Sequence, residues 1–177
     1  GLLQNSGQKL TEKQKLLHFQ HINTAIKNMA QMLDEVSLAG KAEAGQLQCQ
    51  LSYLDIQEFC QGLVVELELS AAKKQIDLVF TCQGQVEKAL WDENLLRHIL
   101  GNLLSNAIKY SSAGSRVQFN LIARSEIVTF QIQDWGIGIP KADLQQLFQP
   151  FHRASNVGST PGTGLGLAIA KKCIEAC

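Results

Sequence analysis

NLLSNAIKYS, at residues 102–111, carries the main fold signal of this sequence, because it is the first of four short motifs in a fixed order. The other three are DWGIGIP at 134–140, FQPFHR at 148–153 and GTGLGL at 162–167. A single glycine-rich turn often arises by chance, whereas four such motifs in this order are specific. Together they indicate one nucleotide pocket.

Polar residues of the first motif recur on one side of a predicted helix. His98, Asn102 and Asn106 are spaced by four, and Lys109 and Tyr110 follow, so we expect this side to face the phosphates. The amide oxygen of Asn106 suits Mg²⁺, and Lys109 would neutralise phosphate charge. In an isolated helix the two asparagines would be interpreted as satisfied polar residues. The KYS sequence and the neighbouring motifs favour the phosphate-facing interpretation.

The GTGLGL motif precedes a helix predicted over Leu167–Cys177. Amide N–H groups and the positive end of the helix dipole would therefore point at phosphate groups. The motif is not a Walker sequence, because no GK[ST] follows it, and it is not a Rossmann fingerprint, because no strand precedes it. A different ATP-binding fold is required.

The four motifs resemble the N box, first glycine box, F box and second glycine box of two-component sensor histidine kinases, over roughly residues 16–177. The resemblance implies an α+β fold of the GHKL superfamily: a two-layer α/β sandwich with a mixed sheet, preceded by a long dimerisation helix. It also implies a protein-histidine kinase that uses ATP and Mg²⁺. Its partners would be a second copy of the chain and a cognate response regulator, whose Asp receives the phosphate.

The resemblance also implies the site residues. It gives catalytic roles to Asn102, Lys109 and Arg153, and it makes Asn106 the Mg²⁺ ligand. The expected ATP-binding residues are Asn106, Lys109, Tyr110, Asp134, Gly136, Gly138, Ile139, Phe151, Gly162, Thr163, Gly164, Leu165, Gly166 and Leu167.

Three of these assignments have structural alternatives. Asp134 would accept a hydrogen bond from the adenine amino group, or it would only form a turn. The residues between Phe148 and Pro161 would form a lid. Phe148 and Phe151 would fasten this lid, or they would anchor the core. Arg153 would reach the terminal phosphate, or it would be a solvated surface residue.

Asn102 separates transfer from hydrolysis within the superfamily that the motifs resemble. Its hydrolysing members carry a glutamate four residues before the magnesium asparagine, and here that position is Asn102. An amide cannot take a proton from water, so phosphoryl transfer to a positioned histidine is favoured over hydrolysis.

The amino-terminal part shows an apolar seam typical of a coiled coil or helical bundle. The seam residues are Phe19, Ile22, Ile26, Met29, Leu33 and Val36, and KAEAG at 41–45 ends the helix. We expect residues 1–45 to hold a hairpin loop and the second dimerisation helix, and residues 46–177 to form the catalytic domain. The alternative is an amphipathic helix packed on its own domain. Residues 1–12 are predicted as loop or tail, with Thr11 as a possible cap.

No histidine fits the phosphoacceptor pattern that the family implies. His18 is followed by Phe19 and His21 by Ile22, instead of an acidic residue. We therefore expect the chain to begin after the acceptor helix and to be unable to phosphorylate itself. In the family the helix over residues 167–177 is normally followed by a further strand or hairpin, so we also expect the chain to lack the carboxy-terminal strand or strands of the sheet. The alternative function is an ATP-binding regulatory or adaptor module without phosphotransfer.

The pattern after Gly45 is mixed. We predict helices at Asp55–Lys74 and Glu93–Tyr110. Strands are predicted at Leu47–Leu51, Ile76–Cys82, Arg116–Ala123 and Ile127–Asp134, with a turn at Arg124–Glu126 joining the last two.

Composition limits the other function classes. Sixteen basic and sixteen acidic residues balance, so nothing indicates nucleic-acid binding or direct membrane contact. No apolar run has the length of a membrane span, and we expect a cytoplasmic location, whether the parent protein is soluble or membrane-anchored. The odd number of cysteines, five, predicts reduced thiols rather than a disulfide framework.

Overall fold

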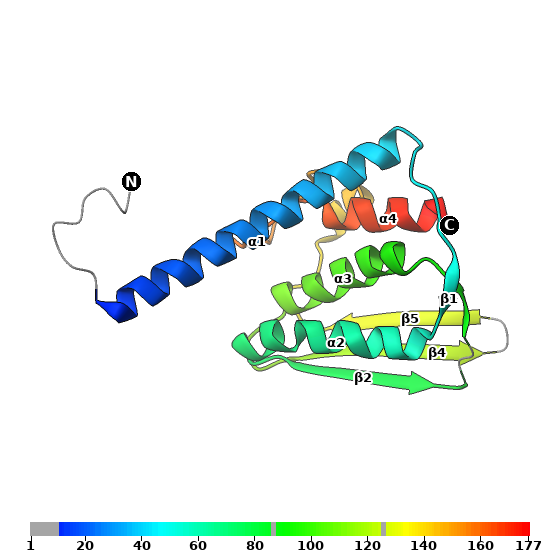
Figure 1. Cartoon of the computed structure of the whole chain (residues 1–177), viewed down its shortest axis with the longest axis horizontal. Helices are drawn as coiled ribbons and strands as arrows, with labels where there is room; N and C mark the ends of the chain where they lie inside the picture. Colours follow the sequence, from blue (N-terminus) through cyan, green and yellow to red (C-terminus); the bar gives the residue numbers. More distant parts are fainter. Residues whose placement is uncertain (1–10, 86–87, 125–126) are drawn as a thin grey trace. The chain divides into compact units, whose positions relative to one another are not determined.

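The computed structural model describes residues 11–85, 88–124 and 127–177 (Figure 1). The predicted loop or tail over 1–12 and the turn Arg124–Glu126 fall largely outside the described residues. The chain divides into two compact units, residues 1–37 and 38–177. None of the described helices combines the length and apolar composition needed to cross a bilayer.

Helix α1, Glu12–Glu43, carries the predicted apolar seam. It begins with a capping box, because Thr11 Oγ1 accepts a hydrogen bond from the Gln14 amide and Gln14 Oε1 accepts one from the Thr11 amide. It ends at the predicted KAEAG segment, where Gly45 takes a positive φ of 65°. The six seam residues remain 47–70% exposed in this chain.

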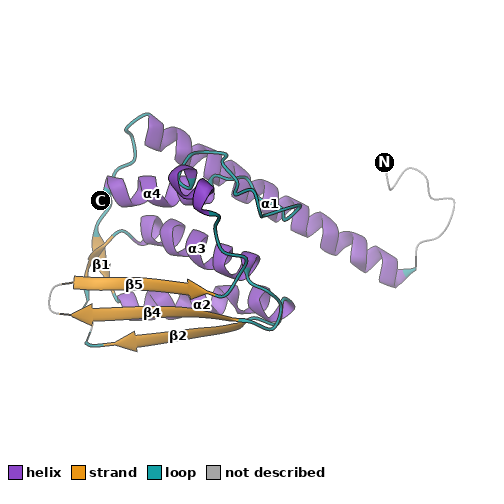
Figure 2. Cartoon of the chain, turned by 180° about the vertical axis from the view of Figure 1, so that it is seen from behind, coloured by secondary structure: helices purple, strands orange, loops and turns teal. Residues whose placement is uncertain are grey.

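The second unit is built on a three-stranded mixed sheet, formed by β2 (Asp77–Gln83), β4 (Arg116–Arg124) and β5 (Ile127–Asp134). The strand order is β2-β4-β5, with β2 parallel and β5 antiparallel to the central β4 (Figure 2). Alternation along β4 directs Val117, Phe119 and Leu121 into the core, where all three are fully buried.

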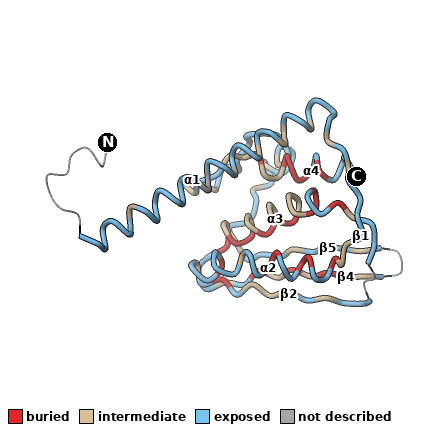
Figure 3. The backbone as a smooth tube through the Cα atoms, in the orientation of Figure 1, coloured by how far each residue is buried: buried red, intermediate tan, exposed pale blue. Residues whose placement is uncertain are grey.

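Helices α2 (Ile56–Lys73) and α3 (Glu93–Tyr110) cover one face of the sheet. Each begins with an aspartate cap, since Asp55 accepts from the Glu58 amide at 3.1 Å and Asp92 from the Leu95 amide at 2.9 Å. Buried backbone runs along these helices and α4 in Figure 3. The central core consists of Ile56, Phe59, Cys60, Leu63, Val64, Leu96, Leu100, Leu104, Phe119 and Leu121. The predicted two-layer α/β architecture is confirmed.

Helix α4, Gly166–Ala176, packs against the side of α3 that faces away from the sheet. Its contact with α3 is a separate apolar cluster of Leu95, Leu165, Ile169 and Cys173. Leu38, Ala39, Leu47 and Cys49 are partly buried against this cluster. The exit of α1 and the following linker therefore belong to the second unit. A short 3₁₀ helix, η1 (Lys141–Gln146), precedes the F box.

The predicted strand Leu47–Leu51 is wrong. The strand β1 is Ser52–Leu54, and it pairs antiparallel with β3 (Ala89–Trp91), which the sequence analysis missed. The linker before β1 makes other contacts: Gln50 donates its backbone N–H to Asp92 Oδ2 at 2.6 Å. That amide is therefore satisfied without a strand partner.

The expectation of five reduced cysteines is also wrong. Cys49 and Cys177 form a disulfide, while Cys60, Cys82 and Cys173 are free. The odd cysteine count excludes only a framework in which every cysteine is paired, so it could not exclude one bond.

Candidate nucleotide-binding site

Helix α3 presents its predicted polar side away from the buried core. Leu96, Leu100 and Leu104 fill the core side, whereas Asn102 and Asn106 are half-buried on another side of the helix. Asn102 lies against the start of α4, since a Cβ added to Gly166 would lie 2.8 Å from Asn102 Oδ1. The N box and the second glycine box are therefore in contact.

Lys109 extends the same contact toward the beginning of the second glycine box. A Cβ at Gly162 would lie 2.5 Å from Lys109 Nζ and 3.7 Å from Tyr110 Oη. The Lys109 ammonium also lies 4.9 Å from the centre of the Tyr110 ring. Lys109 and Tyr110, which are predicted to contact the nucleotide, thus lie beside the glycine backbone. A positive charge at this point would attract a phosphate group.

The carboxy-terminal end of α3 also binds the side chain of Lys74. Its ammonium donates to the carbonyl oxygens of Ile108, at 3.2 Å, and Lys109. A cation at the last carbonyls of a helix is favourable, because it satisfies groups that have no partner within the helix.

The first glycine box lies against this end of α3. Ile137 donates its N–H to the Tyr110 carbonyl at 3.2 Å, and Ser111 and Gly136 form an isolated antiparallel bridge. A Cβ on Gly136 would lie 2.5 Å from the Tyr110 carbonyl oxygen, which is closer than real Cβ contacts allow. Only glycine permits this approach.

Asp134 ends β5 and turns the chain into the first glycine box. Its Oδ1 accepts the Gly136 N–H at 2.9 Å, and the side chain is exposed. This is the turn bond that an Asx residue makes to a backbone two positions on. The turn-forming role is therefore present, and the adenine contact stays a prediction.

The F box contacts the second glycine box through the backbone. Gly164 has a φ of 75°, and a Cβ there would lie 2.7 Å from Phe151 C and 2.8 Å from the His152 carbonyl oxygen. Phe151 has a positive φ of 63°, which is uncommon for a bulky residue. Because strain of this kind clusters at ligand sites, the F box joins the candidate site.

The lid segment between the F box and Pro161 is tied down by side chains that the sequence analysis did not single out as anchors. Asn156 Nδ2 donates to the carbonyls of Ile137, at 3.2 Å, and Gly138, at 3.0 Å. Asp143 Oδ2 accepts from both the amide and the hydroxyl of Ser155, each at 2.9 Å. The signal was available, because Asn, Ser and Asp commonly bond to nearby backbone in loops.

Asp143 is held as a carboxylate by these contacts. Hydrogen bonds from the Ser155 amide and hydroxyl lower the pKa of Asp143 below its ordinary value, and the charge of His152 lowers it further. His152 Nε2 lies 3.7 Å from Asp143 Oδ1, which is an ion-pair distance when the imidazole is protonated. The charged Asp143 of η1 therefore attaches the lid to this helix through Ser155.

Helix α4 begins directly after the glycine turn. Leu165 is its N-cap residue but makes no side-chain cap, and the Leu165 amide donates to Thr163 Oγ1 at 3.2 Å. First-turn amides of a helix have no partner within the helix and can bind an anion. Gly166 and Leu167 of the motif lie in this first turn.

Three predicted residues have exposed side chains. Arg153 Nη2 donates to the Thr160 carbonyl within the lid, and Phe151 is 72% exposed. Ile139 is also exposed, at 46%. Their contacts with nucleotide stay predictions. The N box and the glycine boxes, by contrast, come together as predicted.

The comparisons with known proteins agree with this geometry. Residues 91–177 match the family described as "Histidine kinase-, DNA gyrase B-, and HSP90-like ATPase". The adaptive-response sensory kinase SasA of Synechococcus sp. (strain JA-3-3Ab) is 26% identical over 159 residues, covering 89% of this chain and 42% of that protein. Sensor protein GacS of Pseudomonas syringae pv. syringae is 34% identical over 189 residues, covering 98% of this chain and 20% of that protein. The chain spans less than half the length of these relatives.

Among solved structures, full-length ShkA in complex with AMPPNP has a TM-score of 0.75 and 25% identity. The match covers 96% of this chain and 35% of the ShkA chain. The predicted α+β GHKL fold with a mixed sheet is confirmed by this match together with the family match.

Proposed function

Since residues 91–177 match the histidine kinase-, DNA gyrase B- and HSP90-like ATPase family, we propose that this chain is the ATP-binding catalytic portion of a two-component sensor histidine kinase. It would present the ATP γ-phosphate to a histidine on the dimerisation domain, and a response-regulator Asp would then receive the phosphate. The observation that carries this proposal is the mutual contact of the motifs: α3 with both glycine boxes, and the F box with the second.

The residues fit a nucleotide with Mg²⁺ by their chemistry. Lys109 carries positive charge beside Gly162, and the first turn of α4 offers amide donors, so phosphate oxygens have partners there. Asn106 offers a neutral amide oxygen on the same side of α3 as Asn102, which suits a hard cation that keeps part of its water shell. ATP, when bound, supplies the phosphoryl group. Asp134 would hold the adenine, and Arg153 would reach the terminal phosphate from the lid.

Asn102 supports transfer rather than hydrolysis. It occupies the position of the water-activating glutamate in hydrolysing relatives, and its Oδ1 lies at the start of α4. An amide cannot act as a general base, so a water molecule at this point would not be activated. Catalysis would then depend on positioning and charge neutralisation for an external acceptor.

The acceptor would come from outside this chain. His18 is half-buried and His21 exposed on α1, and each is followed by an apolar residue, so neither fits the acceptor pattern. In this proposal residues 1–45 would belong to the dimerisation domain, with its second helix, and residues 46–177 would form the catalytic domain. The reaction would take place in the cytoplasm, where ATP and response regulators are found.

The absence of a fitting acceptor histidine from this chain's sequence favours a second function for the chain alone, an ATP-binding regulatory or adaptor module. The two functions differ in one property. A kinase portion transfers phosphate to a separately supplied dimerisation domain, whereas an adaptor module binds the nucleotide and transfers nothing.

The test is a binding and transfer experiment. Calorimetry should detect MgATP and MgADP binding, and radiolabelled ATP should phosphorylate the acceptor histidine of a separate dimerisation domain when this chain is added. The control is the same mixture with Asn106→Ala, which should lose the Mg²⁺ dependence of binding. Binding without transfer would favour the adaptor, and no binding would contradict both functions.

A further inference from the structure

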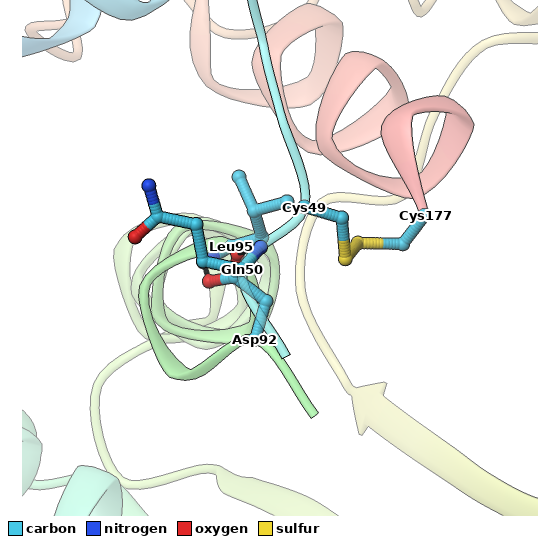
Figure 4. Close-up of a disulfide and its surroundings, with 5 residues drawn as sticks. All are labelled: Cys49, Gln50, Asp92, Leu95 and Cys177. Atoms are coloured by element: carbon cyan, nitrogen blue, oxygen red, sulfur yellow. Dashed lines mark hydrogen bonds between the residues drawn. A yellow bond between two sulfur atoms is a disulfide. The ribbon is translucent and has the colours of Figure 1, made fainter. Parts of the chain in front are cut away.

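The Cys49–Cys177 disulfide joins two segments that the proposed nucleotide chemistry does not use. Cys49 lies in the linker, residues 44–51, that leads from α1 to β1, and Cys177 caps the carboxy-terminal end of α4 (Figure 4). The two residues are 128 positions apart in sequence, and their Cα atoms are 5.6 Å apart. This separation lies within the range that a disulfide requires.

The linker has few other attachments. Gln50 donates to Asp92 Oδ2, the residue that also caps α3, and Figure 4 shows these residues beside the disulfide. Leu47 and Cys49 are only partly buried against the cluster between α3 and α4. The disulfide is therefore the strongest bond between this linker and α4.

Cys49 and Cys177 are more accessible than the nearby third cysteine, Cys173. Cys177 is exposed and Cys49 half-buried, whereas Cys173, one helical turn before Cys177, is fully buried. Burial, together with the charge of Asp92, raises the pKa of Cys173 to about 11. Since the thiolate is the reactive form, Cys173 is a poor competitor for either partner.

We propose that Cys49 and Cys177 are a reversible redox-modification site whose oxidant is a low-molecular-weight disulfide of the glutathione class. The Cys177 thiolate attacks one sulfur of the oxidant and releases one thiolate. The Cys49 thiolate then attacks the Cys177 sulfur of the mixed disulfide and releases the second. Two protein thiols are oxidised, one disulfide is reduced to two thiols, and the thiol protons pass to the released thiolates.

Oxidation closes the linker onto the end of α4, the helix that begins at the second glycine box. Reduction leaves the linker with the Gln50–Asp92 hydrogen bond and partly buried apolar contacts. The redox state thus sets how freely the connection between α1 and the catalytic domain moves.

The experiment compares the chain equilibrated with oxidised glutathione and the same chain with excess reduced glutathione. Mass spectrometry of non-reduced peptides should find Cys49 joined to Cys177. Amide hydrogen exchange in residues 46–51 should be at least about tenfold slower in the oxidised sample. Cys49→Ser should exchange at the reduced rate in both buffers, and Cys82→Ser should behave like the unaltered chain.

Three outcomes would overturn the proposal: pairing of Cys49 or Cys177 with Cys173, covalent dimers in place of the internal bond, or linker exchange that ignores oxidation. These measurements use no nucleotide. A failure here therefore leaves the proposed kinase function untouched, and a failure of ATP binding leaves this proposal untouched.

Discussion

Asp134 has two tasks that a pair of substitutions can separate. Its Oδ1 accepts the Gly136 N–H, which forms the turn, and its proposed second task is to accept a hydrogen bond from the adenine amino group. Alanine removes both acceptors. Asparagine keeps a carbonyl oxygen for the turn, but in that orientation it points an NH₂ group toward the adenine donor.

We expect both Asp134→Ala and Asp134→Asn to weaken MgATP binding by about ten- to a hundredfold, because a hydrogen bond to a charged group contributes about 1.5–3 kcal/mol. Only Asp134→Ala should also lower the free energy of unfolding. Calorimetry and urea unfolding measure the two effects. Wild-type affinity in Asp134→Asn would leave Asp134 as a turn residue alone.

Gly136 tests the packing of the first glycine box on α3. An alanine Cβ would lie 2.5 Å from the Tyr110 carbonyl and 2.9 Å from its carbon, and both are backbone atoms that cannot swing away. We expect Gly136→Ala to cost about 1–3 kcal/mol of unfolding free energy, as overpacking does, and to reduce nucleotide affinity.

Gly101 supplies the matched control for Gly136. It lies within α3, and a Cβ there would meet no atom within 4 Å. Gly101→Ala should therefore raise the unfolding free energy by about 0.5–1 kcal/mol, because alanine favours the helix. Equal effects of the two substitutions in urea unfolding would contradict the close approach at Gly136.

At the scale of an element, the lid depends on a few exposed hydrogen bonds. Asp143→Ala removes the acceptor for the Ser155 amide and hydroxyl. We expect the lid to open more often, trypsin to cleave after the exposed Arg153 several times faster, and MgATP to bind more weakly. Asp77→Ala, which removes an exposed pair with Arg116 on the sheet, should leave the cleavage rate unchanged.

The pH dependence of the lid follows from the same carboxylate. The folded-state pKa of Asp143 is lowered from 3.8, so the Ser155 bonds contribute fully above pH 3.8. Their contribution falls as pH drops through the lower folded-state pKa. Trypsin is inactive in that range, so amide exchange at Ser155 is the appropriate measurement there. The compared quantity is the protection factor, which corrects for the intrinsic pH dependence of exchange. A protection factor at Ser155 that does not fall as pH drops through the folded-state pKa would contradict the role of Asp143.

At the scale of the whole molecule, α1 leaves its apolar seam uncovered within one chain. Ile26 and Leu33 are 58% and 70% exposed, and large exposed apolar stripes mark interaction surfaces. We expect the chain to be a dimer through α1, and Ile26→Asp with Leu33→Asp to make it monomeric. The nucleotide affinity of this variant should stay within about twofold of the wild-type value, since the proposed nucleotide contacts lie on other elements than α1.

Sedimentation equilibrium measures this change. Leu69→Asp, at a 68% exposed apolar position on α2, is the control and should remain dimeric. A wild-type monomer, or a dimer that survives both α1 substitutions, would contradict dimerisation through this helix.

Local sequence signals were enough to predict the long elements and the set of motifs. The bounds of α3 and β5 agree with the prediction, because an eighteen-residue amphipathic helix and an alternating strand carry their signals locally. Asp55 and Asp92 mark helix starts by their capping chemistry. The motif order showed the resemblance to sensor histidine kinases before any contact was known.

Features that depend on contacts between distant residues could not be predicted from local sequence. Strands β1 and β3 have three residues each, too few for a readable period, so their pairing exists only in the fold. The Cys49–Cys177 bond needs two residues 128 positions apart to meet, and the Asn156 contacts need the lid to fold back on the first glycine box. Local sequence carries no information about such approaches, because packing of the whole chain creates them.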